Sequence, residues 1–184
     1  DDALLQRMEW ILWEESDRLD ITCRLNLGIL ESPDQAEEYV LPFPFNLNGT
    51  VHTEILGGFI DHTEERFPTV EHNALSMRRV IRLADKAFSV FWASPDARVV
   101  RIDTETESSK RILKSNLVNN FPGDWNRREK NEGYLDYRFA LTVYTGDDHL
   151  AEAARFGWET AVSPRTEHSF FESEPAQESY MEID

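Results

Sequence analysis

The chain has 184 residues, a formal net charge of −16, 40% hydrophobic and 11% aromatic side chains. This length suits one domain, or one domain with a tail, and the apolar content excludes global disorder. No apolar run approaches the ~20 residues that a membrane-spanning helix needs. An acidic chain also repels nucleic-acid phosphates and anionic lipids, so we expect neither nucleic acid nor membrane as a direct partner.

The N-terminal part predicts a helix followed by a strand. Apolar residues at helical spacing indicate a helix over residues 2–17, with Trp10 and Trp13 widening its apolar stripe. Strict alternation over residues 21–27 then predicts a half-buried strand in which Cys23 faces the core. Because Cys23 is the single cysteine, no intramolecular disulfide can form, and we expect a reducing, cytoplasmic compartment.

A second strand is expected over residues 41–47. Pro42 and Pro44 cannot donate ladder hydrogen bonds, so this strand should lie at the edge of a sheet or at a bulge. Asn48 and Gly49 form a typical hairpin turn that leads into a strand over residues 50–60. We therefore expect a meander of three antiparallel strands in this part of the chain.

The strongest helical pattern covers residues 69–91, where apolar residues recur every three or four positions opposite a basic face. It predicts one long amphipathic helix, which ends before Pro95. A strand is expected at 98–106 and a short helix at 109–119. The best alternating pattern, at 134–144, predicts a further strand.

The C-terminal part begins with a turn whose acidic residues, Asp147 or Asp148, are expected to cap a helix reaching Trp158. From residue 163 the composition changes to an acidic, Ser- and Glu-rich tail. We therefore predict a single α+β domain over residues 1–162, followed by the tail at 163–184. In this domain an antiparallel sheet is packed by the long amphipathic helix, with an N-terminal and a C-terminal helix beside it.

No glycine-rich phosphate loop, nucleophile elbow, zinc-spaced cysteine set or HExxH motif is present. Imidazole and carboxylate side chains concentrate in one stretch, and the weak candidate metal ligands there are His52, Glu54, Asp61 and His62. His52 and Glu54 would share one strand face. Irregular spacings of this kind arise easily in an acidic chain, so we expect no metal and no cofactor. Whether the protein is an enzyme is left open, and the sequence favours a non-enzymatic protein.

The leading functional hypothesis is a non-enzymatic module that binds a basic protein partner through an acidic surface, as immunity proteins and inhibitors of toxins or nucleic-acid-acting proteins do. Aromatic anchors would supply most of the affinity. Two alternatives remain: a secretion-type chaperone that accepts an unfolded segment at the 41–47 edge, and a metal-dependent enzyme using the histidine and carboxylate cluster. The expected partner-binding residues are Trp10, Trp13, Glu14, Glu15, Asp34, Glu37, Glu38 and Trp125; the oligomeric state is not predicted.

Overall fold

The computed structural model describes residues 5–14, 16–26, 37–45, 47, 49–62, 74–104, 111–120 and 133–162. Within these ranges the chain forms eleven β-strands and one α-helix. None of the described residues forms a helix with the length and apolar character to cross a membrane. The elements are β1 (Leu5–Leu12), β2 (Arg18–Asn26), β3 (Glu37–Phe45), β4 (Thr50–Ile55), β5 (Gly58–Asp61), β6 (Ala74–Ser76), β7 (Val80–Ala84), β8 (Phe88–Ala93), β9 (Val99–Thr104), β10 (Arg111–Asn120), β11 (Tyr134–Thr145) and α1 (Leu150–Ala161).

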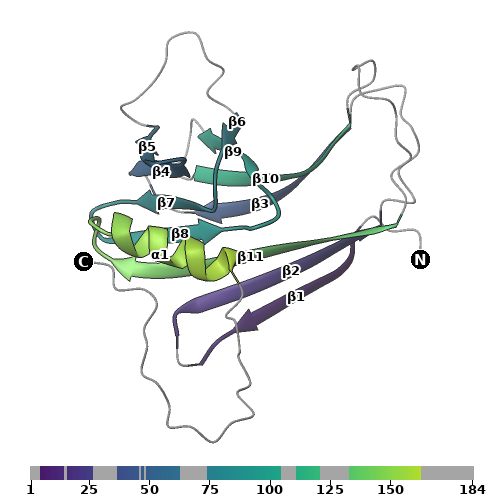
Figure 1. Cartoon of the computed structure of the whole chain (residues 1–184), viewed down its shortest axis with the longest axis horizontal. Coiled ribbons are helices and arrows are strands. Elements are labelled where there is room, and N and C mark those ends of the chain that lie inside the picture. Colours follow the sequence, from purple (N-terminus) through teal and green to yellow (C-terminus); the bar gives the residue numbers. More distant parts are fainter. Residues whose placement is uncertain are drawn as a thin grey trace, which may run out of the picture.

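The strands form two antiparallel sheets that pack face to face (Figure 1). The seven-stranded sheet has the order β1-β2-β11-β8-β7-β4-β5, and the four-stranded sheet has the order β3-β10-β9-β6. Strand β11 lies between β2 and β8, so the last of the described strands connects the β1–β2 hairpin to the rest of the large sheet. The smaller sheet covers only part of the larger one.

The main core lies between the two sheets and is built from inward-facing residues of strands in both sheets. Phe43 of the small sheet packs its ring against two aromatic rings of the large sheet, Trp92 at 5.4 Å and Phe139 at 5.3 Å between centroids. Cys23 belongs to this core and is 1% exposed, which confirms the prediction that it faces inward. These contacts join β3 to β8 and β11 across the sandwich.

Helix α1 covers the outer face of the large sheet, where it contacts β7 and β8 (Figure 1). A second apolar cluster forms there from Val80, Phe91, Ala93, Ala140, Ala153 and Phe156. The helix approaches the sheet closely at Gly157, where a Cβ atom would lie 3.0 Å from Val80 Cγ1. His149 occupies the N-cap position without a side-chain cap bond, so the expected capping by Asp147 or Asp148 is wrong.

The predicted α+β class is wrong, because the described chain is a β-sandwich with one short helix. Where helices were expected over 2–17, 69–91 and 109–119, the described residues form β1 and the turn after it, the strands β6 to β8, and β10, respectively. Every residue of Val80–Ala84 is buried, since one face of β7 meets the small sheet and the other meets α1. A strand that is buried on both faces carries apolar residues at successive positions. The alternation of apolar and polar residues that identifies a half-buried strand is then absent from the sequence.

The turn between β7 and β8 carried a signal that the helical interpretation missed. The Asp85 carboxylate accepts hydrogen bonds from the backbone N–H groups of Ala87 at 2.7 Å and Phe88 at 3.1 Å. This side-chain bonding to the backbone is typical of aspartate in tight turns. The expected helix therefore contains a hairpin.

Other predictions of local structure are confirmed. Strands appear at β2, β9 and β11, a helix appears at α1, and the proline-containing β3 lies at the edge of its sheet. The three-stranded meander is wrong, because β3 belongs to the small sheet whereas β2 and β4 belong to the large one. The predicted tail at 163–184 lies outside the described residues.

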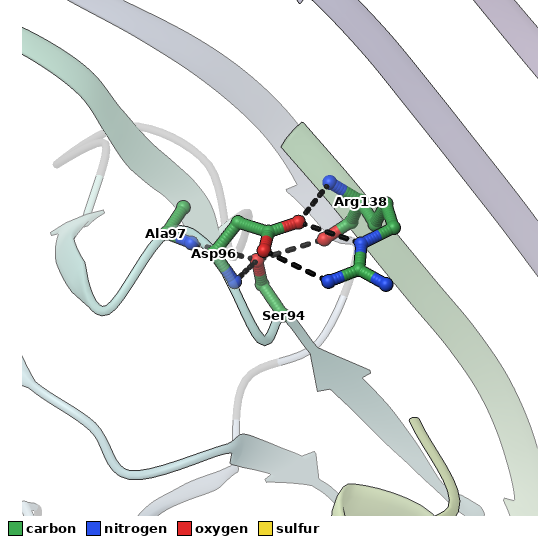
Figure 2. Close-up of polar contacts among 4 residues, drawn as sticks. All are labelled: Ser94, Asp96, Ala97 and Arg138. Atoms are coloured by element: carbon green, nitrogen blue, oxygen red, sulfur yellow. Dashed lines mark hydrogen bonds and ion pairs between the residues drawn. The ribbon is translucent and has the colours of Figure 1, made fainter. Parts of the chain in front are cut away.

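The connection from β8 to β9 carries the chain from the large sheet to the small one, and a polar cluster fixes it to β11 (Figure 2). The Ser94 hydroxyl donates to the Arg138 carbonyl oxygen at 2.8 Å and accepts from the Ala97 N–H at 2.9 Å. The Asp96 carboxylate accepts from the Arg138 backbone N–H and from Nε, both at 2.9 Å, and from Nη2 at 3.0 Å. These bonds satisfy polar groups of a connection that passes between the two sheets and so has no neighbouring strand to pair with.

Candidate binding surface

The β1–β2 hairpin forms one border of the large sheet (Figure 1). Its strands pair without interruption from Arg7 opposite Arg24 to Leu12 opposite Leu19. At the turn, the Trp13 N–H donates to the Arg18 carbonyl oxygen and the Ser16 N–H donates to the Trp13 carbonyl oxygen, both at 3.2 Å. Among the described residues no strand lies beyond β1, so β1 is an edge strand.

Four consecutive large apolar residues are exposed at the end of this edge strand. The exposed fractions are 60% for Trp10, 50% for Ile11, 74% for Leu12 and 51% for Trp13. Trp10 lies opposite Ile21 on β2, and Ile21 is only 1% exposed. Met8, on the same face of β1, still packs against the core, so the cover of the inner face ends between Met8 and Trp10. At this end of β1, apolar side chains are accessible on both faces.

One of these aromatic side chains is held in place. The indole Nε1–H of Trp13 donates a hydrogen bond of 2.7 Å to the Asp20 carboxylate, which also accepts from Arg18 Nε at 2.8 Å. An exposed aromatic ring fixed in this way loses little conformational entropy when a partner covers it.

The arginines of the hairpin already have acidic partners. Arg7 pairs with Glu9, Arg18 pairs with Asp20, and Arg24 binds both oxygens of Asp136 on β11 at 2.7 Å. The hydrogen bond from Arg24 holds the pKa of the Asp136 carboxyl below its usual range.

Two acidic side chains of the turn, in contrast, have no cationic partner among the described residues. These are Glu14 and Asp17, which lie beside Trp13 and are exposed. The tip of the hairpin is therefore locally acidic as well as apolar. We call Trp10, Ile11, Leu12, Trp13, Glu14 and Asp17 the hairpin tip.

A shallow cleft of about 390 Å³ adjoins the hairpin tip, between the turn, the end of β11 and helix α1. Its lining combines two carboxylates with hydroxyl groups and aromatic rings, and the Arg18 guanidinium lies 5.4 Å above the Phe156 ring. The lining residues are Ser16, Asp17, Arg18, Thr142, Val143, Tyr144, Thr145, Phe156 and Glu159.

The structure brings together three of the predicted partner-binding residues, Trp10, Trp13 and Glu14, at the hairpin tip. Glu38 lies elsewhere, on β3 of the small sheet, where it accepts from Arg101 at 2.8 Å and from Asn116 at 3.1 Å. Glu37 begins β3, but its side chain is not described. The remaining predicted residues, Glu15, Asp34 and Trp125, lie outside the described residues.

The histidine and carboxylate side chains of this cluster contact arginines and each other. His52 and Glu54 share the outer face of β4, as expected from alternation. His52 Nε2 lies 3.6 Å from the Asp61 carboxylate, and its Nδ1 lies 3.0 Å from Arg82 Nη1. Glu54 instead forms a buried pair with Arg79.

The fourth candidate ligand, His62, lies just after β5, and its backbone N–H donates to the Val51 carbonyl oxygen at 2.9 Å. In the described part of the chain, no group of three His, Cys, Asp or Glu side chains is placed to hold a metal ion. Arginines occupy the space around His52 and Glu54 where a cation would sit.

Sequence reasoning missed three residues of the hairpin tip, Ile11, Leu12 and Asp17. It placed them inside a helix, where Ile11 and Leu12 would have joined a buried stripe. The sequence feature that could have identified Ile11 and Leu12 is the unbroken apolar run from Trp10 to Trp13. Such a run is compatible with a strand that is accessible on both faces.

No family model matches the chain, and none of the curated proteins matches it. Two solved structures from Enterococcus faecalis share its fold: an alpha-mannosidase, with a TM-score of 0.63 at 10% identity, and a protein in glycosyl hydrolase family 38, with a TM-score of 0.53 at 13% identity. The matches cover 83% and 79% of this chain but 17% of each of those chains. At these identities the similarity establishes the sandwich fold alone, and the expected immunity-protein class is not supported.

Proposed function

We propose that this chain is a non-enzymatic protein-binding module that contacts a basic partner through the hairpin tip. The observation that carries the proposal is the run of four exposed apolar side chains at the end of an edge strand and in the turn after it, of which Leu12 is 74% exposed. Soluble proteins normally protect such edges and keep contiguous apolar patches small, so an unprotected patch marks an interaction site.

The two tryptophans are suited to supply the affinity. Tryptophan is enriched among residues that dominate binding energy, and such residues cluster at the centre of an interface. Trp10 and Trp13 are both more than half exposed. Covering one large apolar side chain completely contributes about 1.5–3 kcal/mol, so covering the exposed parts of both contributes about 2–3 kcal/mol before any polar contact forms.

Charge favours a basic partner. The whole chain carries −16, and Glu14 and Asp17 have no cationic partner among the described residues, whereas Arg7, Arg18 and Arg24 are paired. Opposite charge on the partner accelerates association through long-range attraction, and salt screens this attraction. The single cysteine is buried and free, which supports a reducing, cytoplasmic location as part of the same proposal.

A displayed library of random 12-residue peptides, selected on the immobilised chain, tests the proposal directly. We expect enriched peptides to contain Lys or Arg beside apolar residues. Their affinity should fall at least tenfold for the double variant Trp10→Ala/Trp13→Ala and should weaken with added salt. Leu56→Ala provides a matched control, since Leu56 is 85% exposed at the opposite border of the sheet. Failure to enrich any peptide, or equal binding to the double variant, contradicts the proposal.

The cleft beside the hairpin tip favours a second candidate function, which is binding of a mannose-containing carbohydrate. Its carboxylates and hydroxyls could hydrogen-bond sugar hydroxyls, and the matched fold occurs within an alpha-mannosidase chain. Affinity electrophoresis in mannan gels tests this candidate. Retardation should occur and should be lost in Glu159→Gln but kept in Trp10→Ala; unretarded migration of the wild-type chain rejects it.

A further inference from the structure

We propose that the hairpin tip takes its partner by strand addition: an extended segment of the basic partner pairs with the free edge of β1 and continues the large sheet. This inference rests on the proposed function and specifies how the same surface binds. In strand addition the main-chain hydrogen bonds give affinity, and the side chains at alternate positions give specificity.

The four sheet edges in the described structure are not equivalent. β5 has 4 residues and β6 has 3, which is too short to pair well with another chain. β3 has 9 residues, but it contains Pro42 and Pro44, which have no N–H. In edge strands such prolines face the solvent side, so the free edge of β3 lacks donors at two alternate positions.

β1 is the remaining long edge, with 8 residues and no proline. It has one register irregularity, between Leu5 and Arg7, and then pairs regularly with β2 up to Leu12. In an antiparallel pair, backbone groups point alternately toward the partner strand and away from it. Every second N–H between Arg7 and Leu12 therefore points away from β2, at the edge where a further strand would bind.

The side chains around this edge are arranged to flank an added strand on both faces. Trp10 and Leu12 lie on the inner face, opposite Ile21 and Leu19, and Ile11 lies on the outer face. Cross-strand neighbours lie about 4.5–5.5 Å apart and diagonal ones about 7–8 Å apart, within reach of aromatic side chains. An added strand with apolar residues on both faces would cover these side chains.

Charge favours a basic segment of another protein over a second copy of this chain or its own C-terminal residues as the strand that pairs with β1. The end of β1 leads directly into Glu14 and Asp17, so a Lys or Arg near the corresponding end of the added segment would find an acidic partner. A second copy of this chain would bring another charge of −16, and residues 163–184 of the same chain are net acidic. A basic segment from another protein fits the edge better than either.

Residue-resolved hydrogen exchange of the full chain, free and saturated with the tightest peptide of the selection above, tests the pairing. Strand addition predicts that the alternate amides of residues 7–12 that exchange fast in the free chain slow at least tenfold, as expected when most molecules are bound. The amides already bonded to β2 should change little. Two sets of probe peptides, N-methylated on the odd or on the even residues, should differ in binding. The set whose methyl groups point away from β1 should bind, and the other set should not.

The outcomes separate the two proposals. If binding needs Trp10 and Trp13 but the fast-exchanging amides do not slow, strand addition is wrong while the protein-binding function stands. If binding does not need the tryptophans, the proposed function itself fails. If the alternate amides are already all protected in the free chain, another segment or a second copy occupies the edge, and that result also overturns strand addition.

Discussion

The buried ion pair between Glu54 and Arg79 offers a sharp test of how the outer face of the large sheet is stabilised. Arg79 Nε donates to Glu54 Oε2 at 2.9 Å, and Nη2 donates to Oε1. The side chains are only 8% and 5% exposed. The Arg79 guanidinium carbon also lies 3.7 Å from the ring centroid of Trp158 on α1, so the helix covers the pair.

The substitution Glu54→Gln removes the negative charge and leaves Arg79 buried without a counter-ion. Removing one partner of a buried pair typically costs about 3–5 kcal/mol. The Gln amide oxygen retains one hydrogen bond and the Trp158 ring still faces the cation, which places the expected loss near the lower limit, about 3 kcal/mol. With a urea dependence of about 2 kcal/mol/M, the unfolding midpoint should fall by about 1.5 M.

Urea unfolding followed by circular dichroism measures this loss. Asp136→Asn is the control, because it breaks a pair of similar geometry whose side chains are 48% and 47% exposed, and solvent screening weakens such pairs. The double variant Glu54→Met/Arg79→Met should be more stable than Glu54→Gln, since no buried charge remains. A smaller midpoint shift for Glu54→Gln than for Asp136→Asn would refute the argument.

Three further predictions concern stability and reactivity. A Cβ atom on Gly49 would lie 1.6 Å from the Ala84 carbonyl oxygen, so Gly49→Ala should destabilise the fold by about 3 kcal/mol in thermal unfolding; an unchanged melting temperature would contradict it. Ser94→Ala leaves the Arg138 carbonyl without its donor and should cost about 1–2 kcal/mol in the same assay. Burial raises the pKa of the Cys23 thiol, so disulfide reagents should modify the folded chain far more slowly than the unfolded chain at pH 8. The stabilisation linked to this group is fully present below the ordinary thiol pKa of about 8.5 and is lost as the pH rises from there through the raised pKa of the folded state.

The parts of the fold that could be predicted are the strands with one exposed face. β2 and β11 alternate clearly because one side meets the core and the other meets solvent or exposed ion pairs such as Arg24–Asp136. β7 could not be predicted, because burial on both faces removes the alternation. The pairing of β2 with β11 depends on residues more than a hundred positions apart, and no local pattern encodes such a contact.

Part of the candidate site was predicted correctly even though its secondary structure was not. Trp10, Trp13 and Glu14 were selected for their chemistry, as aromatic anchors and a free charge, and this chemistry holds in a strand as well as in a helix. Ile11 and Leu12 were missed because their exposure depends on the strand geometry. The pairing of Glu54 with Arg79 could not be foreseen from the sequence, since nothing near Glu54 on β4 indicates that its partner lies just before β7.

The position of β11 between β2 and β8 has a consequence for synthesis of the chain. The hairpin joins the large sheet through the pairing that sets Tyr134 opposite Asn26, so it cannot dock until the ribosome has made β11. At about 5–20 residues per second, the wait lasts on the order of 5–20 s. During that time the apolar strands of the hairpin have no sheet to join, and a chaperone that shields nascent chains should meet this segment first.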